Sequence, residues 1–197
     1  MSFSHAPRTV ALTGLVAAGA LALSACSGGQ TSSDGGGFVT ANGGIGTVAR
    51  GERQAPNALK GETLQGKPLD VASLKGEVVV MNVWGSWCPP CRAEAPNFVK
   101  VAAETKEKGV SFVGINTRDT NRGAAIAFEN DYSVNYPSLY DPTGEILLRG
   151  FPKGSLNAQT IPSTIILDRD GKIAARALQP LTEEKLRKMI DPLIAER

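Results

Sequence analysis

The pattern of apolar and polar runs from residue 56 onward predicts one α/β domain. Two nearly continuous apolar runs, at residues 78–84 and 110–115, are typical of strands covered on both faces of a sheet. The segment between them, 91–108, has helical character, and Gly109 fits its C-terminal cap. A crossover of this length predicts a parallel strand pair with a right-handed connection.

Shorter segments add two hairpins and three helices to this unit. One hairpin is expected to turn at Gly66, and the other is marked by an Asp-Gly pair at Asp170. The last helix places five apolar residues on one stripe behind Thr182. The hairpin strands are expected at 59–64 with 68–71 and at 164–167 with 172–177, and the helices at 121–132, 145–150 and 183–194.

The first 25 residues are predicted to be a secretory signal peptide. Arg8 precedes a stretch of 14 residues, 10–23, that carries no charge. This stretch is shorter than the ~20 apolar residues that a membrane-spanning helix needs. It ends in Leu-Ser-Ala-Cys, which resembles the lipobox of bacterial lipoproteins, so Cys26 is the expected lipid attachment site. The alternative is ordinary cleavage beside an incidental cysteine.

Residues 26–55 are predicted to be a flexible tether. Nine of the last 29 of these residues are glycine and few are large and apolar, so the segment buries too little surface to offset its chain entropy. The run at 44–49 imitates a dinucleotide-binding pattern, but Gly51 and Pro56 leave no room for the helix that would hold a pyrophosphate. The predicted organisation is a leader at 1–25, a tether at 26–55 and a folded domain at 56–197.

Charge and composition exclude several kinds of chemistry. A net charge of +2 is too small an excess to suggest a nucleic-acid partner. The single histidine, His5, lies in the predicted leader, which excludes Ser-His-Asp catalysis, Cys-His catalysis and His-ligated zinc in the mature chain. We expect neither a metal nor a cofactor.

Cys88 and Cys91 are the residues expected to carry the chemistry. They stand in the sequence Trp-Cys-Pro-Pro-Cys, between the first predicted strand and the helix that follows it. A thiolate at a helix N-terminus is stabilised by unpaired N–H groups and the helix dipole, so Cys88 is the expected nucleophile and Cys91 the resolving cysteine. A zinc site lacks ligands, because the only other cysteine is Cys26. The spacing alone leaves a structural disulfide open.

These motifs together resemble the thioredoxin superfamily. The resemblance rests on the apolar strand, the cysteine pair, Pro96 and the run Ile-Pro-Ser-Thr at 161–164. Residues 82–88 and the early hairpin are similar to the TlpA/ResA/DsbE-like branch of membrane-anchored extracytoplasmic thioredoxins. The resemblance covers 56–197 and implies a thioredoxin-like α/β fold, a central mixed β-sheet flanked by helices, with an N-terminal β-hairpin and a central helix-strand insert. Asn82 departs from it, since cytosolic thioredoxins have a buried aspartate at that position.

The resemblance also implies roles for residues around the cysteines. Pro162 would follow a cis peptide bond, and Ile161 would present backbone groups to a bound peptide. Glu94 matches an acidic residue of ResA-like proteins that could move the proton during exchange; the alternative is a solvated glutamate in the first helical turn. Trp87 packs or forms part of a docking surface, whereas Trp84 is expected in the core.

We therefore predict a lipid-anchored, extracytoplasmic thiol-disulfide oxidoreductase that acts on protein disulfides. The resemblance implies reduction of partners such as apocytochrome c, a membrane electron donor of the thiol-relay type and a monomeric protein. The two prolines between the cysteines offer no N–H to a thiolate, which favours a potential nearer to about −270 mV than to about −120 mV and hence a reductase. Two alternatives stay open: an oxidant for the folding of secreted proteins, and a tethered binding module with a structural disulfide.

Overall fold

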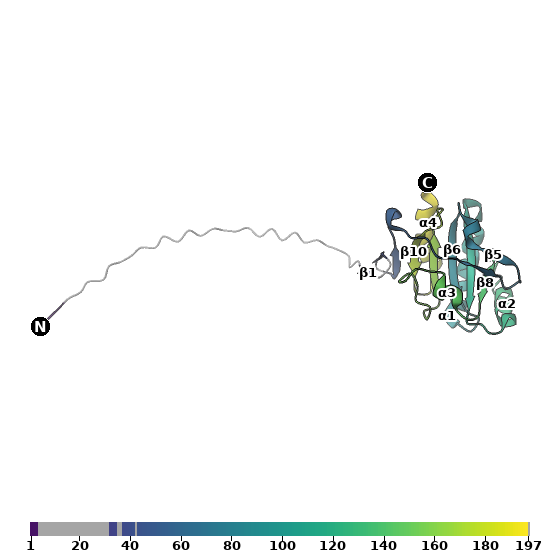
Figure 1. Cartoon of the computed structure of the whole chain (residues 1–197), viewed down its shortest axis with the longest axis horizontal. Coiled ribbons are helices and arrows are strands. Elements are labelled where there is room, and N and C mark those ends of the chain that lie inside the picture. The colour runs from purple at the N-terminus through teal and green to yellow at the C-terminus, as the bar shows by residue number, and fades with distance from the viewer. Residues whose placement is uncertain (4–31, 35–36, 42, 197) are drawn as a thin grey trace.

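The computed structural model describes residues 1–3, 32–34, 37–41 and 43–196. Its main sheet has the strand order β1-β2-β3-β10-β9-β6-β7-β8, and β4 and β5 form a separate hairpin (Figure 1). The strands are β1 Ser32–Asp34, β2 Phe38–Ala41, β3 Ile45–Thr47, β4 Lys60–Glu62, β5 Pro68–Asp70, β6 Val78–Trp84, β7 Val110–Thr117, β8 Ser138–Asp141, β9 Ser163–Leu167 and β10 Ile173–Ala177. The α-helices are α1 Pro89–Thr105, α2 Arg122–Asp131, α3 Glu145–Arg149 and α4 Glu183–Ala195, and the 3-10 helices are η1 Arg50–Glu52, η2 Val71–Leu74 and η3 Lys106–Lys108.

Strand β6 lies at the centre of the sheet. All seven of its residues are buried; it pairs in parallel with β7 and antiparallel with β9. Because side chains alternate along a strand, β6 serves two cores. Val78 and Val80 pack with α1 and α4 on one face, while Val79, Met81 and Val83 face the side covered by α3 and the segment before β4 (Figure 1). The predicted mixed sheet between helices is confirmed.

The connections between these strands follow the predicted pattern. Gly66 takes a φ of +76° in the β4–β5 turn, and Gly109 takes +72° after η3, as its capping position requires. Thr182 caps α4 by accepting the N–H of Lys185. Helix α2 and strand β8 form the insert between β7 and β9, which the family resemblance implied.

The prediction of a flexible tether is wrong for its second half. Strand β3 pairs with β10 through three consecutive residue pairs, and β2 pairs with β3. The side chains of Phe38 and Val48 are buried in the same core as β6. A Cβ at Gly46 would lie 3.2 Å from the Cβ of Phe38, so this glycine permits close packing. By pairing with β10, this segment covers what would otherwise be an exposed strand edge.

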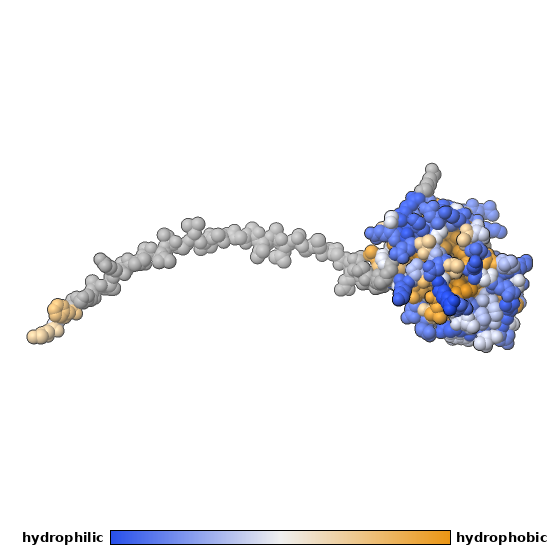
Figure 2. Space-filling view, in the orientation of Figure 1, coloured by the Kyte–Doolittle hydropathy of each residue, from blue (hydrophilic) through white to orange (hydrophobic). Residues whose placement is uncertain are grey.

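The predicted leader and the lipid attachment site fall on residues that the structure leaves undescribed. Residues 4–31 contain almost all of the signal peptide and Cys26, so both remain predictions. In the described part of the chain, every helix is too short or too polar to cross a membrane. The face of the domain seen in Figure 2 is mostly hydrophilic, with hydrophobic residues gathered near its middle.

Candidate active site

The two cysteines lie at the junction of β6 and α1, where the sequence predicted them. Cys88 is the N-cap of α1, and its sulfur accepts the N–H of Cys91 at 3.3 Å. The two sulfurs form a disulfide with an S–S distance of 2.08 Å and a Cα–Cα distance of 5.3 Å. Pro89 and Pro90 occupy the first two helical positions, so Cys91 supplies the N–H that reaches the cap.

Solvent exposure does not distinguish the two cysteines. Cys88 is 2% exposed and Cys91 is 1% exposed, and both belong to one apolar cluster with Trp84 and Phe128. Their difference is one of position in the helix, because only Cys88 stands at its N-terminal end. That position stabilises a thiolate on Cys88 more than one on Cys91.

Ile161 and Pro162 directly precede strand β9, the antiparallel neighbour of β6. The peptide bond between them is cis, as the resemblance implied. Strand β9 begins directly afterwards and runs antiparallel to β6, pairing Ser163 with Val83. Ile161 consequently packs against the cluster that contains both cysteines. The fold thus brings together two motifs that stand 70 residues apart in the sequence.

Glu94 is buried, so the alternative of a solvated first-turn glutamate is wrong. Its residue is 2% exposed; one carboxylate oxygen accepts the side-chain N–H of Asn82 at 2.9 Å and the other accepts the backbone N–H of Leu181 at 2.9 Å. Both donors are neutral. Burial raises the pKa of Glu94 from 4.5 to about 7, although these two hydrogen bonds oppose the shift.

The two tryptophans near the cysteines have different environments. Trp84 is buried and stacks on Phe128 with ring centroids 4.4 Å apart, which confirms its expected place in the core. Trp87 is 49% exposed and stands next to Cys88 in the chain. A large exposed indole beside a reactive pair is a feature of docking surfaces.

A polar network that the sequence pattern did not predict holds the loop before Cys88. Asp119 is buried, and its carboxylate accepts the backbone N–H of Ser86 at 2.7 Å, the Ser86 hydroxyl at 2.6 Å and the side-chain N–H of Asn116 at 2.6 Å. Arg92 donates two N–H groups to the carbonyl oxygen of Ser86 at 2.9 and 2.8 Å. Asp119 follows the end of β7, next to the end of β6, and that topology is the one signal that could have indicated it.

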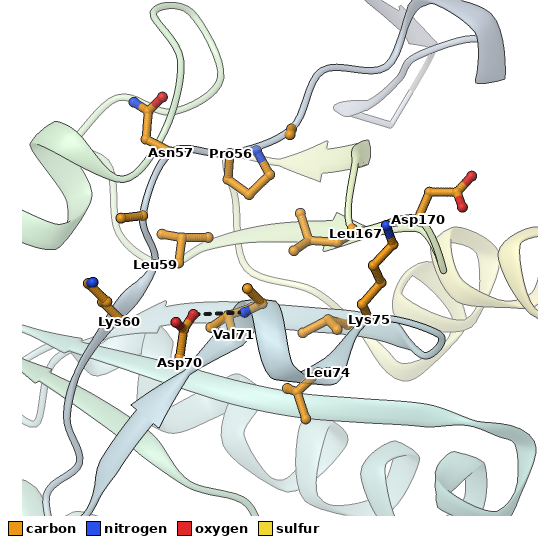
Figure 3. A pocket seen from close by; sticks show the side chains of 15 residues that line it. Pro56, Asn57, Leu59, Lys60, Asp70, Val71, Leu74, Lys75, Leu167 and Asp170 are labelled. Carbon is orange, nitrogen blue, oxygen red and sulfur yellow. Dashed lines mark hydrogen bonds between the residues drawn. The ribbon is translucent and has the colours of Figure 1, made fainter.

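A separate apolar cavity of about 350 Å³ lies away from the cysteines. It is bordered by the start of β6 at Val79 and the end of β9 at Leu167, whereas Cys88 follows the other end of β6. Figure 3 shows Leu59 and Val71 in its wall and the carboxylate of Asp70, which accepts the N–H of Ala72 at 3.0 Å. The cavity takes no part in the cysteine site. Within the described residues, no group of three or more His, Cys, Asp or Glu side chains is placed to hold a metal ion.

The fold and the site define a class of protein. A Cys-x-x-Cys disulfide follows the central strand and caps a helix, and a cis-proline directly precedes the adjacent strand. This is the arrangement of thioredoxin-fold exchange proteins, in which a dithiol and a disulfide interconvert by thiolate attack.

Comparison with known proteins agrees with this class. The Redoxin family model matches residues 50–190. The chain is 31% identical over 134 residues to the thiol-disulfide oxidoreductase ResA of Bacillus thuringiensis, covering 68% of this chain and 73% of ResA. It is 35% identical over 130 residues to the thiol:disulfide interchange protein HelX of Rhodobacter capsulatus, covering 65% and 68%. The crystal structure of a secreted thiol-disulfide isomerase from Corynebacterium glutamicum superposes with a TM-score of 0.73 at 30% identity, covering 79% of this chain and 94% of that one.

The chain belongs to the Redoxin family and is a thioredoxin-like thiol-disulfide oxidoreductase. The matched range includes both cysteines, Glu94, Ile161 and Pro162.

Proposed function

We propose that this enzyme reduces protein disulfides outside the cytoplasm, with Cys88 as nucleophile and Cys91 as resolving cysteine. The observation that carries the proposal is the cap geometry. Cys88 stands at the N-terminus of α1, but its sulfur accepts an N–H from Cys91 alone. The two helical residues between the cysteines are prolines, which have no N–H to donate. The thiolate of Cys88 is stabilised enough to attack, but less than at a helix N-terminus with all its N–H groups.

The first step is attack by the Cys88 thiolate on one sulfur of the partner's disulfide. The partner's S–S bond breaks, an intermolecular S–S bond forms at Cys88, and one partner thiolate leaves. Because Cys88 is almost fully buried, the partner must approach along the surface around it. That surface includes the exposed Trp87 and the half-buried Ile161.

The second step is attack by Cys91 on the sulfur of Cys88. The intramolecular disulfide seen in the structure forms, and the second partner thiolate leaves, so that two electrons have passed to the partner. Cys91 must first lose its thiol proton. Glu94 lies one helical turn further along α1, and its pKa of about 7 makes its carboxylate a suitable proton acceptor near neutral pH.

A weakly stabilised thiolate favours the reductase direction. The less the reduced form is stabilised, the more readily it gives up its electrons, so the potential lies nearer to thioredoxin's than to that of a strong oxidant. Ile161 before the cis-proline agrees, since thioredoxins tend to place isoleucine there. Among exported proteins such an enzyme needs a source of electrons, and we infer a membrane donor of the thiol-relay type.

The place of action follows from the predicted leader. An export signal at 1–25 and acylation of Cys26 would hold the domain on the outer side of the cell membrane. The related C. glutamicum protein is itself described as secreted. Oxidised apocytochrome c is the partner that the family resemblance suggests. Cys26→Ser is expected to release the protein from membranes, whereas retention of that variant would point to an uncleaved leader.

A redox titration against glutathione tests the direction. We expect the Cys88–Cys91 couple near about −270 mV, and a value above about −180 mV would instead assign the enzyme as an oxidant for secreted proteins. A Pro90→Ala variant restores one N–H at the helix start and is expected to raise the potential. An unchanged potential in that variant would contradict the role given to the prolines.

A further inference from the structure

The indole of Trp87, the residue before Cys88, lies over Gly85. A Cβ at Gly85 would be 2.8 Å from the indole nitrogen of Trp87, so the ring occupies the space that a side chain at Gly85 would fill. The ring is nevertheless 49% exposed. The indole therefore offers an exposed apolar surface directly next to Cys88 in the chain.

Arg118 packs on the same ring from the end of β7. Its guanidinium carbon is 5.1 Å from the centroid of the Trp87 ring. Its backbone has a φ of +58°, a left-handed conformation that is uncommon for arginine, and its N–H donates to the carbonyl of Asp141 at 3.2 Å. Strained backbone held by its surroundings is often found at functional sites.

The guanidinium of Arg118 has donors without acceptors. Its Nη1 lies 3.4 Å from the side-chain oxygen of Gln159, a long contact, while Nε and Nη2 are shielded from solvent and have no hydrogen-bond partner among the described residues. The neighbouring carboxylate of Asp119 is occupied by Ser86 and Asn116. The guanidinium as a whole is only partly buried, but its two shielded N–H donors have unused hydrogen-bonding capacity, which a carboxylate could satisfy through two parallel hydrogen bonds.

We propose that Trp87, Arg118 and Gln159 form a docking surface for protein segments that carry a carboxylate beside their reactive cysteine. The three residues come from three loops around the disulfide, and Gln159 stands two residues before the cis peptide bond. The carboxylate takes the unpaired N–H groups of Arg118 when the exposed indole shifts aside, and the indole then covers the aliphatic part of the segment. This inference rests on the proposed function, because it names the substrate class of the same site.

Small disulfide substrates test the proposal directly. Symmetric disulfide dimers of the blocked peptide Gly-Cys-X-Gly, with X as Glu, Gln or Lys, are reduced by the reduced protein at low salt, and each rate constant is divided by that of dithiothreitol on the same peptide. The natural chain is expected to prefer the Glu peptide over the Gln peptide by about tenfold, the order expected for one charge-assisted pair. The Lys peptide is expected to be slowest.

Variants at Arg118 separate the effect of its bidentate hydrogen bonding from the effect of its charge. Arg118→Asn, which suits a left-handed backbone, is expected to abolish the preference for Glu over Gln. Arg118→Lys, which retains a point charge, is expected to keep only part of it. Arg149→Gln, a change at an exposed arginine on α3, is the matched control and is expected to keep the full preference.

The possible failures have different meanings. Exchange with every peptide but no preference for Glu, or a preference that survives Arg118→Asn, would overturn the docking proposal alone. Absence of exchange with all three peptides would overturn the proposed function as well. If circular dichroism shows that Arg118→Asn is unfolded, two other measurements provide the test. These are the preference of the Arg118→Lys variant for the Glu peptide and the loss of the natural chain's preference at high salt.

Discussion

Two buried carboxylates at opposite ends of β6 and β9 have opposite surroundings. The carboxylate of Asp168, just after β9, forms an ion pair with Nη1 of Arg53 at 3.0 Å. It also accepts the backbone N–H groups of Asp170 and Lys172 at 3.0 and 2.9 Å. Glu94, at the cysteine end, is at least as well buried but receives only neutral donors. One end of the sheet holds a carboxylate that has a cationic partner, and the other holds a carboxylate that readily changes its protonation state.

The difference separates stability from chemistry. A compensated ion pair holds β9 and α4 to the early segment, because Arg53 also bonds Glu196 at 2.6 Å, beyond the end of α4. The uncompensated carboxylate has little to contribute to stability when it is charged, and it stands one turn from the resolving cysteine. Substitutions at the cysteine end should therefore reduce disulfide exchange, whereas substitutions at the opposite end should reduce folding stability.

The largest effect is expected at the cysteine end. Cys88→Ser should lose disulfide exchange almost completely and remain folded, since the attacking thiolate is gone. Cys91→Ser should accumulate a mixed disulfide with the partner through Cys88, because the resolving thiol is gone. Mass spectrometry of the trapped complex checks this. Alkylation of the reduced natural chain near neutral pH should label Cys88 before Cys91, and the reverse order would remove its role as nucleophile.

The opposite end should lose stability without losing chemistry. Arg53→Met leaves Asp168 buried without its cation, and breaking such a pair costs about 3–5 kcal/mol. Urea unfolding should show this loss, while exchange per folded molecule stays that of the natural chain. Lys100→Met removes the cation of a far more exposed pair with Glu183 and serves as control, with little change expected. A slowed exchange in folded Arg53→Met would contradict the separation of the two ends.

A smaller effect is expected in the pH dependence of stability. The raised pKa of Glu94 means that the folded state binds its proton more tightly than the unfolded state does, so this group's contribution is favourable below pH 4.5 and is lost as the pH rises through about 7. The shift corresponds to a loss of about 3 kcal/mol. Glu94→Gln should flatten the curve of unfolding free energy between pH 5 and pH 8. An unchanged slope would mean that Glu94 is charged in the fold without penalty.

Local patterns predicted the centre of the fold and most of the site. The apolar run of β6, the capped start of α1 and the turn glycines are encoded by adjacent residues, and Cys88 and Cys91 stand at a junction that the pattern makes visible. The cis bond before Pro162 and the insert were predicted by family resemblance, since no local pattern specifies them.

The features that were missed depend on distant partners. Strand β3 looks like a linker because its pairing strand, β10, comes near the end of the chain. Arg53 and Asp168 are 115 residues apart, and Ser86 and Asp119 are 33 apart. The burial of Glu94 depends likewise on Leu181, 87 residues away. Composition cannot show which glycine-rich segment completes a sheet or which carboxylate the fold will enclose.

The pH profile of the second exchange step tests the contrast between the two carboxylates most directly. The mixed disulfide is formed rapidly between reduced protein and a chromogenic disulfide, and its resolution by Cys91 is followed by stopped flow from pH 5 to pH 9. The natural chain should show a break near pH 7 that Glu94→Gln lacks, while Arg53→Met keeps it. Identical profiles for the natural chain and Glu94→Gln would show that the buried carboxylate of Glu94 has no part in the chemistry.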